Sequence, residues 1–206
     1  MPRRAGNHRH FLGLRVTKPK LIVKDLAPTL WPALEALFGP RGACGGCWCM
    51  YWRLEKGERW EDLQGAPAKR RLKRLVESGE AQGAIAFAGQ EPVGWIAFGP
   101  RADFPRLERA RTLACENSDQ VWSLPCFYIK PGWRDRGVAA ALLEHSLKSL
   151  RRRGVRIAEG YPVNLKPGQR LPNAFAWTGT RSIFANAGFE LAGAGGTSKV
   201  RMRRRP

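Results

Sequence analysis

Short apolar runs between residues 20 and 206 are the first regular feature of this chain. Gly, Pro or charged residues bound them, and their lengths are typical of strands rather than helices. We expect strands at 21–23, 84–88, 93–98, 124–129, 155–162 and 199–202. The second and third runs are joined by Gly89-Gln90-Glu91-Pro92, and this connection predicts a hairpin.

Other segments repeat their apolar residues at spacings of three and four, which predicts helices at 28–38, 67–78 and 138–153. The order of strands and helices predicts an α+β fold with a mixed sheet. Residues 1–19 mix His, Arg, Gly and Pro without an apolar period. We therefore expect a mobile basic arm at 1–19, followed by a single domain at 20–206.

The charge balance of the chain is strongly positive. The net charge is +19, from 36 Lys and Arg against 17 Asp and Glu, and it predicts attraction to anions such as CoA, nucleic acid or acidic protein. No apolar run reaches membrane-spanning length, and no signal-type segment follows Met1, so we expect a cytoplasmic protein without membrane contact. Five cysteines, an odd number, do not fit a secreted disulfide framework.

The segment from Ile129 to Leu143 predicts a binding site for a phosphate. An apolar strand ends at Pro131-Gly132, and a helix follows a short loop that contains Gly137. Such a junction directs unpaired backbone N–H groups and the positive end of the helix dipole toward one point. Glycine allows a close approach of the backbone, and the arginines of the loop add positive charge.

The spacing Arg134-x-x-Gly137-x-Ala139 resembles the acyl-CoA pyrophosphate loop of the GCN5-related N-acetyltransferase (GNAT) superfamily. The segments that follow agree with this resemblance, because 179–190 is similar to the family's last helix and the strand that begins at Phe189. The match covers about residues 120–192. It implies an α/β sandwich-like GNAT fold, in which helices flank a central mixed, mostly antiparallel sheet.

The resemblance also implies acetyl-CoA as cosubstrate, held by the strand before the loop, by the loop itself and by the last helix. The pantetheine then lies along residues 126–130, and the backbone N–H of Ile129 polarises the thioester. The cofactor-binding residues that the resemblance implies are Phe127, Tyr128, Ile129, Arg134, Asp135, Arg136, Gly137, Val138, Ala139, Ala140, Ser182 and Phe184.

In such a family the acyl group passes directly to an amine acceptor, which here is an unidentified small molecule or protein. We choose Glu159 as the candidate general base, because in this fold its strand splays from its neighbour. Tyr161 lies on the same side of that strand and either donates a hydrogen bond or packs. A surface glutamate paired with one of the many arginines explains Glu159 equally well.

Phe184 departs from the family pattern. Many members carry there a tyrosine that protonates the leaving thiolate, and phenylalanine has no proton to give. Ser182, Tyr128, Tyr161 or water then takes that role, or the thiolate leaves unassisted. The substitution also supports a second hypothesis, an acyl-CoA-binding sensor or scaffold with degenerate catalysis.

The segment 42–53 combines cysteines with aromatic residues. Cys44, Cys47 and Cys49 lack a fourth ligand nearby in the sequence, so we expect no metal. The resemblance puts this segment beside the acceptor, and it predicts an aromatic acceptor wall, although a hydrophobic plug at the sheet edge is an alternative. The residues proposed for the wall are Trp48, Tyr51 and Trp52.

A third hypothesis uses the charge alone and makes the chain a nucleic-acid-associated protein. The basic runs follow predicted helix faces and the basic C-terminal end, and we find no zinc-finger spacing and no aromatic RNA-binding strand. Solvated helix faces explain the charge as well. Dimers are common for the fold that this chain resembles, so a homodimer is compatible with the acetyltransferase hypothesis.

Overall fold

The computed structural model describes residues 20–165, 173–193 and 198–206. The arm predicted at 1–19 lies outside the described residues. Among the helices in these ranges, none combines the length and the apolar character that a membrane span requires.

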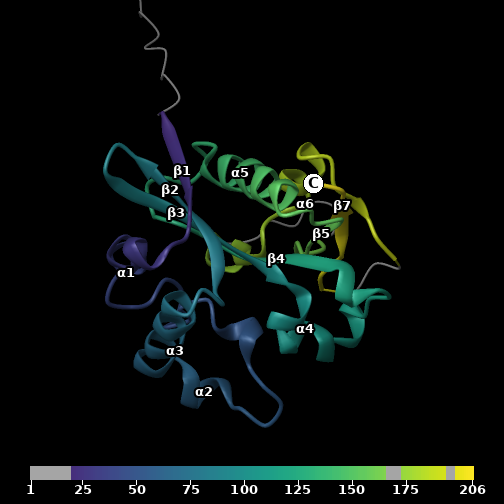
Figure 1. Cartoon of the computed structure of the whole chain (residues 1–206), viewed down its shortest axis with the longest axis horizontal. Helices are drawn as coiled ribbons and strands as arrows, with labels where there is room; N and C mark the ends of the chain where they lie inside the picture. Colours follow the sequence, from purple (N-terminus) through teal and green to yellow (C-terminus); the bar gives the residue numbers. More distant parts are fainter. Residues whose placement is uncertain (1–19, 166–172, 194–197) are drawn as a thin grey trace, which may run out of the picture.

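The described residues form one seven-stranded sheet, in the order β1-β2-β3-β4-β5-β7-β6 (Figure 1). Neighbouring strands are antiparallel, except for the parallel pair of β4 and β5. The mixed, mostly antiparallel sheet that the sequence predicts is confirmed. The strands are β1 (Leu21–Asp25), β2 (Gln82–Ala88), β3 (Glu91–Pro100), β4 (Val121–Ile129), β5 (Ile157–Gly160), β6 (Glu190–Leu191) and β7 (Met202–Arg204).

The last strand begins at Met202 rather than at 199, because regular pairing with β5 and β6 starts at Met202, whereas Lys199 forms an isolated bridge with Val163. The helices are α1 (Trp31–Phe38), α2 (Trp60–Leu63), α3 (Ala66–Glu77), α4 (Pro105–Arg109), α5 (Val138–Arg152) and α6 (Arg181–Asn186). The 3₁₀ helices are η1 (Pro28–Leu30), η2 (Tyr51–Arg53), η3 (Arg101–Asp103), η4 (Arg111–Leu113), η5 (Ser118–Gln120) and η6 (Asn173–Thr178). The short α2 and α4 are too brief to show an apolar period in the sequence.

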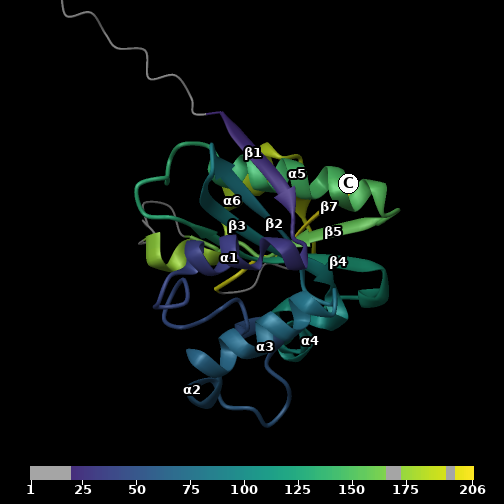
Figure 2. The ribbon, with the colours of Figure 1, turned by 60° about the vertical axis from the view of Figure 1, so that its left-hand side comes forward.

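Helices cover both faces of the sheet. Ala84 and Ala86 of β2 belong to the apolar cluster under α5, and the alternate residues Ile85 and Phe87 belong to the cluster under α1 and α3. This alternation follows from the two-residue period of a strand. Because both faces are buried, β2 and β3 are nearly continuous apolar runs, as their sequences show. Figure 2 shows α5 on one side of the sheet and α3 on the other.

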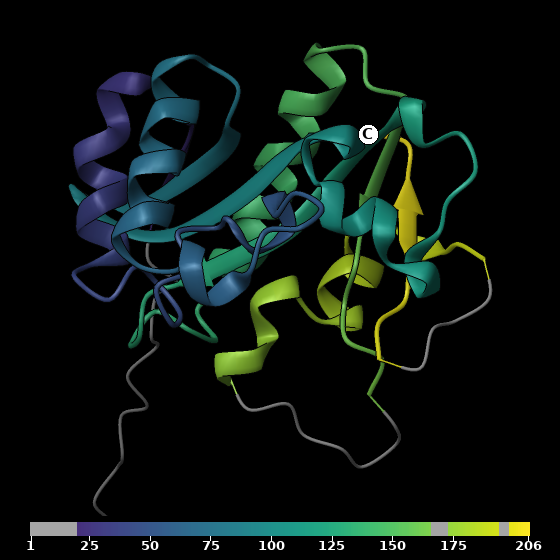
Figure 3. The same cartoon turned by 90° about the horizontal axis from the view of Figure 1, so that it is seen from below.

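The feature of the fold that positions the site is the divergence of β4 and β5. Strand β4 pairs with β3 along its length, but with β5 only from Val121 to Leu124. Pro125 comes next and has no N–H to continue the ladder. The register between β3 and β4 also shifts at this level, between Ala97 and Gly99. Beyond Leu124, η6 contacts β4 in place of another strand (Figure 3).

Candidate functional site

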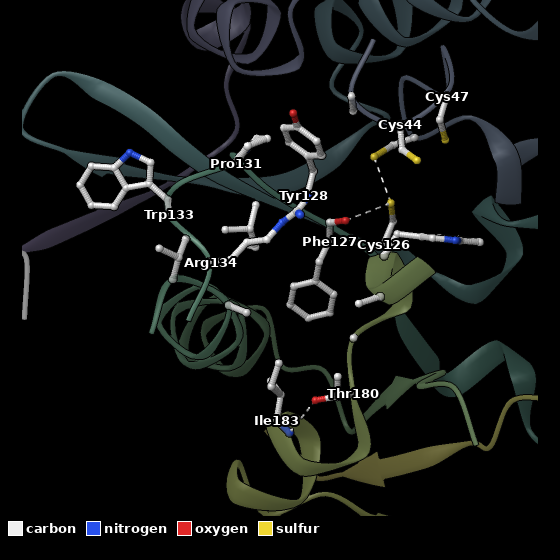
Figure 4. A pocket seen from close by; sticks show the side chains of 18 of the residues that line it. Cys44, Cys47, Cys126, Phe127, Tyr128, Pro131, Trp133, Arg134, Thr180 and Ile183 are labelled. Carbon is white, nitrogen blue, oxygen red and sulfur yellow. Dashed lines mark hydrogen bonds between the residues drawn. The ribbon is translucent and has the colours of Figure 1, made fainter. Parts of the chain in front are cut away.

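A cavity of about 630 Å³ opens beside the second half of β4. Five parts of the chain line it: the end of β4, the loop that follows β4, the start of α5, the connection from residue 41 to 60, and the segment from η6 to α6. Figure 4 shows Phe127, Tyr128 and Cys126 of β4 around it, with Arg134 of the following loop and Thr180 and Ile183 on the opposite side.

The N-terminus of α5 forms one end of this cavity. Gly137 caps the helix with a left-handed backbone, φ 80°, which glycine adopts without strain. The first intrahelical bond is donated by Ala141 to the Gly137 carbonyl, at 3.0 Å. The N–H groups of residues 138–140 therefore have no acceptor within the helix, and these residues line the cavity. Orphan N–H groups and the positive helix end favour an anionic ligand there.

The exposed backbone edge of β4 forms one side of the cavity. The N–H of Lys130 donates to Val93 of β3 at 3.0 Å, so Lys130 and Val93 form a hydrogen-bonded pair. In an antiparallel ladder such pairs alternate with pairs that direct their polar groups away from each other. Phe127 and Ile129 occupy those alternate positions, opposite Ile96 and Gly94. Their N–H groups therefore point to the edge that β5 leaves open.

Of the twelve residues predicted to hold the cofactor, nine line the cavity, and the exceptions are Arg136, Ser182 and Phe184. The guanidinium of Arg136 lies over the Trp133 ring, 5.4 Å from its centroid. The hydroxyl of Ser182 is 3.0 Å from that of Thr180, which caps α6. The resemblance missed Trp133, Thr180 and Ile183, which also line the cavity; their types carry no signal for this role.

Phe184 is a core residue here. Its ring is fully buried and meets the rings of Phe127 and Phe189 edge to face, with centroids 5.9 and 5.0 Å away. A Cβ at Gly160 would lie 2.1 Å from this ring, and one at Gly179 would lie 2.9 Å from it. The ring thus fills the space that two glycines leave, and it does not reach the cavity.

The three residues predicted for the acceptor wall do not all line the cavity. Tyr51 lines the cavity, but Trp48 and Trp52 do not. Trp48 stacks against Trp31, and the indole Nε1 of Trp52 donates to the Pro125 carbonyl at 3.1 Å. Both rings are therefore part of the packing behind the wall, as the plug alternative predicted.

The aromatic wall is completed by Trp60, nine positions after Tyr51, and by the distant Trp177. The Tyr51 ring meets those of Trp60 and Trp177 edge to face, with centroids 5.5 and 5.3 Å away. Both tryptophans line the cavity. Sequence reasoning did not find them because neither lies in a segment with a clear period.

Glu159 and Tyr161 lie in a buried polar cluster rather than at the cavity. Arg101 Nη1 donates to Glu159 Oε1 at 2.9 Å and to the Tyr161 hydroxyl at 2.8 Å. The other Glu159 oxygen accepts from Arg201 at 3.1 Å and from Arg203 at 2.5 Å. The Tyr161 hydroxyl is also 2.6 Å from Ser123 Oγ.

This cluster corrects the expected position of the candidate base. Glu159 is on the part of β5 that still pairs with β4, it is fully buried, and both its oxygens are held by guanidinium groups. It does not line the cavity. Burial raises the pKa of Tyr161 well above 10, and the Glu159 charge adds to the shift, so the phenol keeps its proton. We therefore do not carry either residue forward as an acid or base.

Four cysteines line the cavity: Cys44, Cys47, Cys49 and Cys126. Burial and the nearby Cys49 raise the pKa of Cys47 to about 12. A hydrogen bond to Cys49, together with burial, holds the pKa of Cys126 well above its usual value. In the described part of the chain, no group of three or more His, Cys, Asp or Glu is arranged to hold a metal ion.

Solved structures share this fold. The S. lividans PAT GNAT domain matches with a TM-score of 0.54 and 17% identity, covering 89% of both chains. Salmonella typhimurium yncA, solved with its cofactor acetyl-CoA, matches with a TM-score of 0.53 and 12% identity, covering 90% of this chain and 93% of that one. The paia N-acetyltransferase of Thermoplasma acidophilum, in complex with coenzyme A, matches with a TM-score of 0.52 and 15% identity, covering 91% of this chain and 99% of that one.

At these identities the likeness shows the fold alone. No curated protein matches the chain. The model of the acetyltransferase (GNAT) family matches residues 48–165. That is more than half of the 206 residues, so the chain belongs to this acetyltransferase family.

Proposed function

We propose that this protein transfers an acetyl group from acetyl-CoA to an amine by direct attack, without an acyl-enzyme. One observation carries the proposal: the orphan N–H groups of the α5 N-terminus and the open edge of β4 face the same cavity. The orphan N–H groups suit a diphosphate, and the open strand edge suits an extended amide chain. Acetyl-CoA contains a diphosphate and an extended amide chain. The structural relatives solved with acetyl-CoA and coenzyme A support this choice.

In this arrangement the diphosphate lies at residues 137–140 with Arg134 beside it, and the pantetheine adds to β4 like a short strand. The Ile129 N–H, directed to the open edge, donates to the thioester carbonyl. A donor fixed in a water-poor cavity stabilises the negative charge that develops on that oxygen during attack. Removing one such donor typically costs about a hundredfold or more in kcat.

Direct attack fits the chemistry of the wall. An acyl-enzyme on Cys47 or Cys126 would need a thiolate, and the raised pKa of each keeps it as a thiol at neutral pH. Asp135, in the loop before α5, is the only carboxylate among the described lining residues. The amine loses its proton to water, and the CoA thiolate, whose conjugate acid has an ordinary pKa of about 8.5, takes a proton from Tyr128 or from water. Of the three side chains suggested from the sequence for this role, Tyr128 is the one that lines the cavity.

The acceptor lies against Tyr51, Trp60 and Trp177, which present aromatic faces and edges rather than carboxylates. A single amine on an apolar or aromatic body suits this wall. A polyamine does not, because the chain carries a net charge of +19 and the described wall offers it no acidic groups.

The test is calorimetric titration of acetyl-CoA into the wild type, Ala139→Glu and Ala141→Glu. Ala139 lines the cavity at the second position of α5, and Ala141 does not line it. The glutamate at 139 puts bulk and negative charge at the proposed diphosphate site. We expect it to weaken binding by about tenfold or more, which is about 1.4 kcal/mol, while Ala141→Glu binds like the wild type.

Absence of binding to the folded wild type would overturn the proposal, and so would equal weakening by both variants. Turnover is measured separately, as CoA release with a panel of amines at saturating acetyl-CoA. Tight binding with no release for any amine would favour the acyl-CoA sensor or scaffold instead of a transferase.

A further inference from the structure

Two cysteines from distant parts of the chain meet at the cavity wall. The sulfur atoms of Cys49 and Cys126 are 3.2 Å apart, although 77 positions separate the residues in the sequence. Cys49 is 7% exposed and Cys126 6% exposed, and both line the cavity. Since they are otherwise buried, the cavity is the route by which a small molecule reaches either sulfur. Figure 4 shows Cys44, Cys47 and Cys126 on the same side of it.

The backbone is strained to bring Cys49 to this place. Trp48 and Cys49 both have left-handed backbones, with φ of 43° and 54°, a conformation that non-glycine residues rarely adopt. Such strain persists only where the surrounding packing over-determines it. Here the Trp48 ring stacks on Trp31, and the indole Nε1 of Trp95 donates to Cys49 Sγ at 3.0 Å. These contacts hold the Cys49 sulfur toward β4.

We propose that Cys49 and Cys126 are a redox-active pair, which a peroxide entering through the cavity converts to a reversible disulfide. A disulfide needs an S–S distance of about 2.05 Å, so the sulfurs must approach by roughly 1 Å. The bond would tie β4 to the segment that carries Tyr51. It would thus couple the proposed acyl-CoA strand to the proposed acceptor wall.

The chemistry uses peroxide as the only oxidant. The Cys49 sulfur attacks one peroxide oxygen, the O–O bond breaks, and the thiol proton leaves with the other oxygen as water, which gives a sulfenic acid. Burial keeps Cys126 as a thiol, so its proton moves to the departing hydroxyl as its sulfur attacks the Cys49 sulfur. The S–O bond breaks, the S–S bond forms, and a second water leaves. The two thiols lose two electrons in total, and a dithiol reductant returns them.

The first experiment treats the reduced protein with hydrogen peroxide and maps the cross-linked peptides by mass spectrometry without reduction. We expect a peptide pair that joins Cys49 to Cys126, lighter by two hydrogen atoms and released by dithiothreitol. Cys126→Ser must lack it. The control Cys115→Ser must keep it, because Cys115 does not line the cavity. A disulfide between Cys44 and Cys47 instead, or oxidation of both sulfurs without a cross-link, would overturn the proposal.

The second arm rests on the proposed function, because it uses acetyl-CoA as the occupant of the cavity. We expect saturating acetyl-CoA to slow the formation of the Cys49–Cys126 cross-link at least tenfold. The same concentration of acetyl-CoA has no such effect on Ala139→Glu. If calorimetry shows no binding, the proposed function fails and the cross-link alone decides the redox pair. If acetyl-CoA binds and the rate is unchanged, access through the cavity is wrong.

Discussion

The two halves of β4 differ in what lies along their second edge. From Val121 to Leu124 the strand pairs with β5 over a cluster of charged and hydroxyl side chains. Beyond Leu124 the edge is open to a cavity lined mainly by apolar, aromatic and thiol groups. The charged side chains of Glu159 and Arg101 lie at the closed half, whereas the open half presents the free backbone N–H groups of β4 together with the Cys126 thiol and the Tyr128 phenol. Residue type alone is therefore a poor guide to the site in this fold.

The closed half uses its charges to hold connections in place. Arg101 is 1% exposed, and besides Glu159 and Tyr161 it donates to the carbonyls of Leu107 and Leu113, at 3.2 and 2.7 Å. These bonds fix the connection between β3 and β4 against the end of the sheet. A buried guanidinium is tolerated only when nearly all its donors are satisfied, so this cluster is an interdependent unit.

Glu159→Gln tests the closed half most severely. It leaves three guanidinium groups without their shared carboxylate, of which Arg101 is fully buried. We expect the free energy of unfolding to fall by about 3–5 kcal/mol, measured by urea denaturation. The matched control is Glu144→Gln, whose exposed pair with Lys148 is worth at most about 0.5 kcal/mol.

The same variant decides whether the comparison of the two halves holds. A Glu159→Gln protein with wild-type stability, whose turnover loses the limb of its pH profile that reports a general base, would show that Glu159 acts in catalysis. The distinction between a structural and a functional half would then be wrong.

Phe184→Tyr tests the boundary between the halves, because the Phe184 ring touches Phe127 of the open half and lies close to Gly160 at the end of β5. The new hydroxyl enters a fully buried site whose ring neighbours are aromatic. We expect a loss of about 1–3 kcal/mol in stability and no gain in kcat. The measurement is thermal unfolding together with CoA release; a faster, equally stable variant would mean that position 184 reaches the reacting thiol.

Alkaline pH provides the mildest test, since burial raises the pKa of Tyr161 well above 10. Unfolded tyrosine has a pKa of about 10, so above that pH the unfolded chain releases a proton that the folded protein keeps. Stability attributable to Tyr161 is complete below pH 10 and falls by about 1.4 kcal/mol per pH unit above it.

Tyr161→Phe removes this contribution to the dependence of stability on pH. The variant is less stable at pH 7, because Ser123 and Arg101 lose a hydrogen-bond partner, but its stability declines less steeply above pH 10. Denaturation curves at a series of alkaline pH values compare the two slopes. Equal slopes would mean that the phenol ionises as readily in the folded protein as in the unfolded one.

The sequence by itself determined the long strands, the helices α1, α3 and α5, and the position of the proposed anion-binding end of α5. Apolar periods, Pro131-Gly132 and Gly137 are local signals, and local geometry converts them directly into a strand, a loop and the N-terminus of α5. The twelve residues for the cofactor came from the resemblance to the GNAT family, and nine of them line the cavity.

Only the tertiary structure decided which side chains face that cavity beyond the loop. Glu159 is a buried partner of arginines because β4 and β5 still pair at its level, and the strands diverge only after the next pair, Leu124 and Gly160. Trp177 contacts Tyr51 and Cys126 contacts Cys49 at the cavity wall, and the two residues of each pair are more than 70 positions apart. Such contacts depend on how layers pack over long separations, and no local period in the sequence encodes them.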